Sequence, residues 1–323
     1  MHIPGGKQKM TSLAQNGLLP YLACLAAGLF ISTLTGFASA RNLNLKRKTM
    51  PVCLTLALPL ALFCARVFYF LVQISYVYST YGFSFLWSPL LKGYAFTGAL
   101  LGGWLSGLLC ARLTKQSAAS VLDAVTPAGM LMIAAARFGE YFMHFGDGSY
   151  IENEALHFFP LAVKNEYGEW YLAVFVLEAF FALFICLYTL VHGFPKSGDR
   201  VRAALLLICV SQVMLESLRA ESIRWGFVRV QQLSCVLIAF IVLIESIFRR
   251  YKGGMRLVYT FAHIGIFVIC TGVCIGVEFV LDKTDIPAAA SYTAMALSLI
   301  IMAAAALRMI IDEPKKEGRL SST

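Results

Sequence analysis

The sequence predicts an all-α membrane protein, a polytopic bundle of about nine transmembrane helices. Three observations predict this fold class. The composition is 59% hydrophobic and only 14% charged, whereas soluble domains carry about 25% charged residues. The mean hydropathy is +0.72. The apolar residues form long blocks instead of alternating with polar ones, which favours helices over membrane-spanning β-strands.

Each apolar block is long enough to cross the hydrocarbon core, which requires about 20 helical residues. The expected spans are 17–39, 51–76, 92–113, 119–143, 169–192, 201–219, 230–248, 257–281 and 287–311. No Gly/Ser-rich linker and no internal repeat divides them. We therefore expect one membrane domain of about seven spans in residues 1–250, followed by two additional spans and a tail in residues 251–323.

The charges of the connecting loops predict the orientation. Short cytoplasmic loops are enriched in Lys and Arg. The basic loops are 41–48, 110–115, 194–202 and 248–256, and those that lean acidic are 146–155 and 281–285. This alternation predicts an outer N-terminus and a cytoplasmic C-terminus. It also accounts for the net charge of +9, so no nucleic-acid partner is expected.

The N-terminal segment has a second interpretation. Lys7 and Lys9, the apolar run and the small residues Ala38–Ala40 resemble a secretory signal peptide. Four basic residues follow within eight positions, and cleavage would require them to cross the membrane. We therefore favour an uncleaved first span. No cofactor is expected, because the nine cysteines are scattered through apolar stretches without a metal-ligand pattern.

Four charged residues fall inside different spans at a similar depth. A helix rises about 1.5 Å per residue. Arg66 lies fifteen residues from Pro51 at the cytoplasmic start of its span, or roughly 22 Å from it. Counted from Asp123, His192 and Arg202 near the cytoplasmic ends of their spans, Arg137, Glu178 and Glu216 each lie fourteen residues away, or roughly 21 Å. All four are therefore expected in the outer half of the bilayer.

Charges inside a membrane are costly and usually functional. One interpretation is a buried salt-bridge network that locks the bundle. The other is an anion site open to the outer leaflet, in which Arg66 and Arg137 hold a phosphate, since guanidinium groups match its geometry. Arg219 and two further outer arginines would extend the positive field. The expected ligand is phosphatidylglycerol or another anionic phospholipid.

Six segments, in this order, resemble the prolipoprotein diacylglyceryl transferase family. They are FCARVFYFLVQ (63–73), FTGALLGGWLSGLLCAR (96–112), VLDAVTPAGMLMIAAARFGEYF (121–142), VFVLEAFFAL (174–183), MLESLR (214–219) and WGFVRVQQLSCVLIAF (225–240). The resemblance covers about residues 17–248 and leaves the last two spans outside.

The resemblance implies a multi-pass enzyme of the bacterial cytoplasmic membrane. That family moves the diacylglyceryl group of phosphatidylglycerol to the lipobox cysteine at a prolipoprotein signal peptide and releases glycerol phosphate. The positions that match the family's motifs are Arg66, Gly98, Arg137, Gly139, Glu178, Glu216 and Arg219.

Three positions depart from the family pattern. Its histidine before the glycine pair is Thr97 here, its asparagine after the signature arginine is Glu140, and an arginine of its late motif is Gln212. The departures leave two functions open: a diacylglyceryl transferase with altered acid–base groups, or a catalytically inactive phospholipid-binding homologue acting as a scaffold or accessory subunit. A small-solute transporter ranks last, because paired repeats and broken spans are missing.

Thr97 is no base near neutral pH, but a histidine is. We expect His144, four residues after Glu140, to replace the missing family histidine together with Glu140. The competing interpretation is a solvated histidine at an interfacial helix end. Tyr21, near the outer end of the first span, is expected to bind a lipid headgroup, although tyrosines at that depth are often ordinary interfacial residues.

Overall fold

The computed structural model describes residues 5–88, 93–143, 145–165, 167–225, 228–251, 257–284 and 286–311, and side chains from residue 17 onward. Within these ranges, nine helices are long and apolar enough to cross a membrane, which confirms the predicted polytopic all-α bundle. His144 and the predicted cytoplasmic tail lie outside the described residues.

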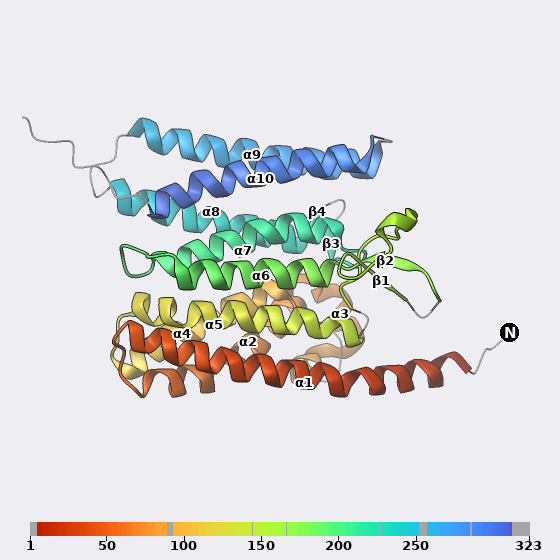
Figure 1. Ribbon diagram of the computed structural model, residues 1–323, viewed down its shortest axis with the longest axis horizontal. Coiled ribbons are helices and arrows are strands. Elements are labelled where there is room, and N and C mark those ends of the chain that lie inside the picture. Colours follow the sequence, from red (N-terminus) through yellow and green to blue (C-terminus); the bar gives the residue numbers. More distant parts are fainter. Residues whose placement is uncertain are drawn as a thin grey trace, which may run out of the picture.

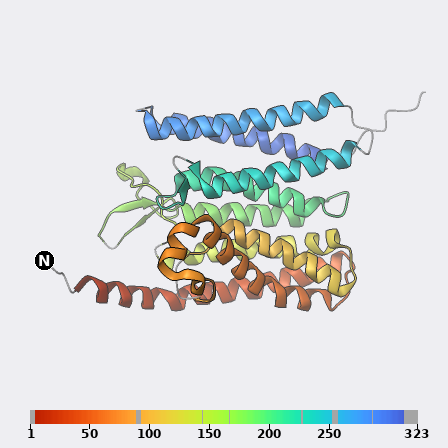
Figure 2. The ribbon, with the colours of Figure 1, turned by 180° about the vertical axis from the view of Figure 1, so that it is seen from behind.

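The long helices form a bundle of roughly aligned elements (Figure 1). They are α1 (Gly5–Asn42), α2 (Thr49–Val72), α4 (Phe96–Thr114), α5 (Ala118–Gly139), α6 (Val174–Val191), α7 (Asp199–Leu218), α8 (Val230–Tyr251), α9 (Leu257–Lys283) and α10 (Ala288–Ile311). Both views place α9 and α10 along one side of the bundle and α1 along the other, with α5 to α8 between them (Figures 1 and 2).

Short elements gather at one end of the bundle, which we call the hairpin end. They are α3 (Ile74–Tyr81), η1 (Gly82–Trp87), η2 (Glu140–Met143), η3 (Glu154–Leu156), β1 (Ala162–Lys164), β2 (Trp170–Leu172), β3 (Arg224–Trp225) and β4 (Val228–Arg229). β1 pairs antiparallel with β2, with Val163 opposite Tyr171. β3 and β4 form a second small antiparallel pair.

Several span boundaries differ from the sequence prediction by a few residues, and two of them lie where another element intervenes. The predicted span 51–76 ends at Val72, because the backbone leaves helical geometry at Gln73 before α3 begins. The predicted span 169–192 starts only at Val174, because residues 170–172 form strand β2. In both places the apolar sequence continues through the change, so hydropathy alone does not locate it.

The main hydrophobic core is shared by α5 to α10. Its largest fully buried side chains include Leu206 and Ile208 of α7, Leu243 of α8, and Met295 and Met302 of α10. α10 packs directly on α7. The two C-terminal helices therefore bury their apolar side chains in the same core as the preceding helices.

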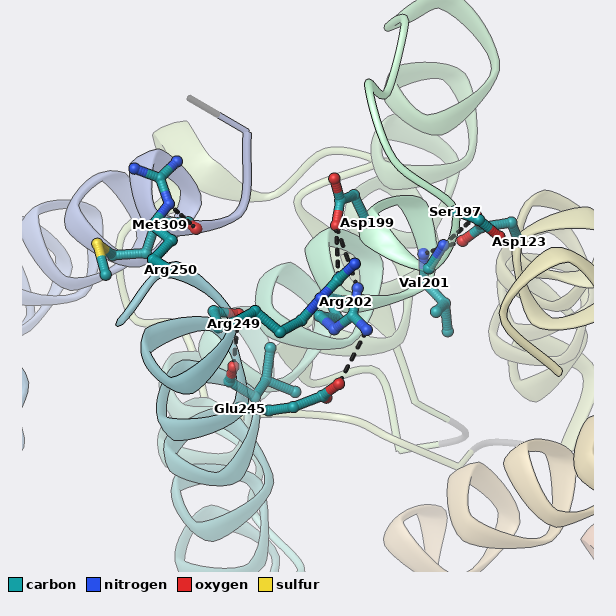
Figure 3. Close-up of polar contacts among 12 residues, drawn as sticks. Asp123, Ser197, Asp199, Val201, Arg202, Glu245, Arg249, Arg250 and Met309 are labelled. Atoms are coloured by element: carbon teal, nitrogen blue, oxygen red, sulfur yellow. Dashed lines mark hydrogen bonds and ion pairs between the residues drawn. The ribbon is translucent and has the colours of Figure 1, made fainter. Parts of the chain in front are cut away.

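The end of the bundle away from the hairpins carries a polar cluster at the start of α7 (Figure 3). Asp123 of α5 accepts hydrogen bonds from the backbone N–H groups of Gly198, at 2.5 Å, and Val201, at 2.9 Å. The first N–H groups of a helix have no partner within the helix, and a carboxylate suits that position. Asp123 therefore caps α7 from a neighbouring helix.

Ion pairs extend this cluster to α8. Asp199 accepts from Arg202, at 3.1 Å, and from Arg249, at 2.9 Å, and Arg202 also contacts Glu245 at 2.8 Å. Figure 3 shows these contacts converging between α7 and α8. We call Asp123, Asp199, Arg202, Glu245 and Arg249 the opposite-end clamp. It ties α5, α7 and α8 together.

Candidate functional site

The end of α5 places the signature arginine at the hairpin end. Arg137 lies in the last turn of α5, where a cation interacts favourably with the helix dipole. Gly139 ends the helix, and the Tyr21 ring of α1 lies against it. A Cβ at position 139 would come within 2.8 Å of that ring, so only glycine allows this approach. Tyr21 thereby lies beside the residues that follow Arg137.

Four side chains form a closed network of alternating charges, which we call the site network. Arg137 binds Glu140 through Nη1 at 2.6 Å and Glu178 through Nε at 3.0 Å. Arg219 binds both carboxylate oxygens of Glu178 through Nη1 at 3.3 Å, and Glu140 through Nη2 at 3.4 Å. Each carboxylate thus bridges two guanidinium groups that come from α5 and from the end of α7.

The site network is withdrawn from solvent. The Glu178 side chain is fully buried, and the other three side chains are 10 to 16% exposed. Removing ions from water costs several kcal/mol each, and their mutual attraction often no more than offsets this cost. Such a network is therefore weak evidence for stability, whereas ionisable groups within membrane spans usually mark a functional site.

Glu216 adds a third carboxylate beside this network. It is buried in the last turn of α7 and lies within electrostatic range of Arg219, Glu178 and Arg137. Its carboxylate makes no hydrogen bond or ion pair with the residues that the structure describes. A negative charge at a helix C-terminus opposes the helix dipole. Glu216 is therefore placed against local preference, which is typical of functional residues.

Gly146 covers the network and was not predicted from the sequence as a site residue. Its φ of +78° favours glycine, and a Cβ there would lie 2.5 Å from Glu140 Oε2 and 2.9 Å from Arg219 Nη2. The loop continues across the end of α7, where the Ala220 N–H donates to the Asp147 carbonyl at 3.1 Å. The sequence signal was the GDG turn directly after the signature segment.

Arg66 makes contacts of another kind. Its guanidinium donates to the backbone carbonyls of Phe85 at 3.1 Å, Ser88 at 2.5 Å and Gly93 at 3.2 Å. It also lies 3.7 Å from the centre of the Phe85 ring, a cation–π contact. The sequence placed Arg66 at the depth of the acids, whereas these contacts join it to described residues on the chain between α2 and α4.

Thr97 and Gly98 open α4, and both are buried. A Cβ at position 98 would lie 2.5 Å from the Cys64 carbonyl and 2.7 Å from the Ala65 Cα of α2. Small residues allow membrane helices to approach closely in this way. Gly98 therefore fixes the distance between α2 and α4, the two helices that hold Arg66 and Thr97.

Gln212 lies one helical turn before Glu216 on α7 and is fully buried. Its Oε1 accepts a hydrogen bond from Gln231 at 2.9 Å. Its Nε2 has no hydrogen-bond partner among the described residues. A buried donor left unpaired costs about 1–3 kcal/mol, so this amide is a candidate to meet a ligand oxygen.

The chain was compared with known proteins. A family model described as prolipoprotein diacylglyceryl transferase matches residues 11–249. Curated phosphatidylglycerol–prolipoprotein diacylglyceryl transferases are similar to it. The Listeria innocua protein is 23% identical over 72% of this chain and 86% of its own length. The Clostridium novyi protein is 24% identical over 70% of this chain and 90% of its own length. The Limosilactobacillus reuteri protein is 25% identical over 72% of this chain and 87% of its own length. The match covers most of the chain and every member of the site network, and the chain therefore belongs to the prolipoprotein diacylglyceryl transferase family.

Proposed function

We propose that the chain transfers the diacylglyceryl group of phosphatidylglycerol to the lipobox cysteine of a prolipoprotein. The reaction takes place where the hairpin end meets the outer leaflet of the bacterial cytoplasmic membrane, and the prolipoprotein presents its signal peptide there. Family membership supports the reaction class. The observation that carries the proposal is the bridge that Glu140 forms between Arg137 and Arg219.

The transfer is a substitution at carbon. The cysteine sulfur forms a bond to the glycerol carbon that carries the phosphate, and the carbon–oxygen bond to that phosphate breaks. The departing oxygen keeps the electron pair, and glycerol phosphate leaves. The thiol proton must pass to a base, because the thiolate is the nucleophile. The protein must therefore stabilise charge at the leaving phosphate and accept one proton.

Arg137 and Arg219 are suited to the leaving phosphate. Glu140 offers one oxygen to each guanidinium, which is the pattern that two phosphate oxygens would offer. A guanidinium has five donors and prefers such paired contacts. The four network charges formally cancel, so a phosphate binds well only when it replaces Glu140 in the bridge. The two arginines then face the oxygen on which negative charge grows.

When the phosphate replaces Glu140 in the bridge, the Glu140 carboxylate becomes free. The Glu140 side chain is the most exposed of the site network, at 16%. We assign the acceptance of the thiol proton to Glu140 together with His144. Histidine titrates near neutral pH, where a general base works best. Glu140 and His144 would thus supply the base that the family pattern provides as a histidine at the position of Thr97.

The surrounding residues are proposed to bind the lipid. Gln212 would donate its unpartnered amide to a substrate oxygen. Glu216 would hold Arg219 by charge, and Glu178 would hold both arginines. The residues proposed to shape the headgroup pocket are Tyr21, Arg66, Thr97, Gly98 and Gly139.

A transfer assay tests the proposal. The purified protein is mixed with vesicles of phosphatidylglycerol labelled in the diacylglyceryl group and with a peptide that contains a lipobox. We expect thiol-linked label on the peptide and an equal amount of released glycerol phosphate. A peptide with serine in place of cysteine is the control. Phosphatidylglycerol binding without any labelled peptide would instead identify an inactive lipid-binding homologue. Equal transfer from other anionic phospholipids would widen the lipid specificity.

A further inference from the structure

Glu278 is an acidic residue of α9, beyond the segment that the family model matches. Most of α9 is apolar and faces outward, and its buried side is a stripe formed by Phe267, Cys270, Cys274 and Val277. Glu278 directly follows this stripe near the hairpin end. A carboxylate at such a position is costly unless it is paired.

Arg229 of β4 and Gln232 of α8 pair with Glu278. Gln232 Nε2 donates to Glu278 Oε1 at 2.7 Å. The Nε of Arg229 lies 3.8 Å from Glu278 Oε2, with side chains 9% and 14% exposed. The charge of Arg229 is therefore neutralised, within this part of the molecule, by an acid from the additional helix.

The same two residues hold the end of α7. Arg229 Nη1 lies 2.6 Å from the carbonyl oxygen of Glu216 and 2.8 Å from that of Arg219. Gln232 Nε2 donates to the Val213 carbonyl at 2.8 Å. The carbonyls of Glu216 and Arg219 lie at the end of α7, where carbonyl groups lack a partner within the helix and need such donors. The backbone that carries Glu216 and Arg219 is thus fastened through Arg229 and Gln232 to Glu278.

We propose that Glu278 is a positioning residue of the transferase site, and that α9 and α10 complete this site by fixing Arg219 through Arg229 and Gln232. This inference rests on the proposed function, in which Arg219 holds the lipid phosphate. A displacement of about 1 Å in a group that orients a substrate can cost about 100-fold. Loss of the Glu278 charge removes the ion-pair partner of the buried Arg229 and leaves it the weaker electrostatic interaction with Glu216, so the fastening of Arg219 loosens.

The test compares Glu278→Leu and Glu278→Gln in the full chain, in phosphatidylglycerol vesicles with a lipobox peptide. For Glu278→Leu we expect the KM for phosphatidylglycerol to rise about tenfold while the KM for the peptide stays unchanged. Glu278→Gln should show a smaller rise, because its amide oxygen still accepts from Gln232. The matched control is Asp282→Asn on the same helix, since Asp282 is exposed and pairs only with its neighbour Lys283 among the described residues.

A purely structural role gives a different result. It lowers the fraction of active protein, and therefore the maximal rate, without changing either KM. That result overturns the proposal even if Glu278→Leu folds poorly, because Glu278→Gln is measured beside it. Arg229→Gln combined with Glu278→Gln should raise the KM less than the product of the single effects, since both changes break one contact. Independent effects also overturn the proposal.

Failure of the proposed function is recognised separately. If the unmodified protein transfers no lipid, the reaction assignment fails. The dissociation constant for phosphatidylglycerol, measured for the same variants, then still tests Glu278. It must rise about tenfold for Glu278→Leu and stay constant for Asp282→Asn.

Discussion

The two ends of the bundle each hold arginines paired with acids, but the two clusters satisfy their charges differently. In the opposite-end clamp, Asp123 and Asp199 lie at the N-terminus of α7, where backbone N–H groups and the helix dipole favour them. The side chains of Glu245 and Arg249 in the clamp are 52% and 38% exposed, so water also solvates their charges.

Arg137 of the site network lies at the favourable end of α5, but the carboxylates of the network accept no hydrogen bond from a described backbone N–H group. These carboxylates are held by guanidinium groups alone among the described residues, and the adjacent Glu216 lies at the unfavourable end of α7. We infer from this difference that the clamp maintains the fold. We propose that the site network keeps two arginines ready for an anion.

The largest expected effect follows from removing a cation of the site network. Arg137→Gln should lower kcat/KM for phosphatidylglycerol by about 1,000-fold, because one donor to the leaving phosphate is lost. Arg202→Gln in the opposite-end clamp is the matched control and should leave kcat unchanged. Steady-state transfer rates measure both. If Arg137→Leu gives a more stable and equally active protein, the network serves packing only.

Glu140→Gln should separate binding from chemistry. We expect kcat to fall about 100-fold, because the proposed acceptor of the thiol proton is weakened. The KM for phosphatidylglycerol should fall as well, since no negative charge then competes with the phosphate. Glu245→Gln is the control from the clamp. An unchanged kcat removes Glu140 from the proton transfer, and full turnover in His144→Ala removes His144.

Arg66→Gln should have a moderate effect on activity and a clear one on stability. The substitution deprives the carbonyls of Phe85, Ser88 and Gly93 of their charged donor. The free energy of unfolding should fall by about 2–3 kcal/mol. Transfer should decrease about tenfold, because η1 and the start of α4 are no longer held in place by Arg66. Denaturant unfolding in detergent and the transfer assay test this, and unchanged stability contradicts it.

The smallest effect on activity is expected in the clamp. Asp199→Asn weakens the contacts to Arg202 and Arg249, of which the second is partly exposed. Because the Asp199 side chain is buried, the free energy of unfolding should fall by about 3 kcal/mol, and the KM for phosphatidylglycerol should stay constant. A change in that KM would show that the two ends are coupled and would contradict the assignment of the clamp to the fold alone.

The sequence was sufficient for the spans and for part of the site. Hydropathy locates a membrane helix because about 20 apolar residues are needed to cross the bilayer. The constant rise per residue then brings Arg137 and Glu178 to one level, and the structure joins them at 3.0 Å. These features depend on one helix at a time, which is why the sequence reveals them.

The sequence was insufficient where partners come from distant segments without periodicity. Arg66 meets carbonyls of a segment that has no hydrophobic repeat, so its partners were not predicted. The contact of Glu140 with Arg219 depends on how the end of α5 faces the end of α7. Glu278 is a single acid in an apolar helix, and nothing in the sequence indicates that it pairs with Arg229.

The central claim is that the site network, and not the opposite-end clamp, binds the lipid headgroup. The most direct measurement is the equilibrium dissociation constant for phosphatidylglycerol in Arg219→Gln and Arg249→Gln, two variants with the same change of charge. The account predicts an increase of at least about tenfold for Arg219→Gln and none for Arg249→Gln. Equal dissociation constants for the two variants would contradict it.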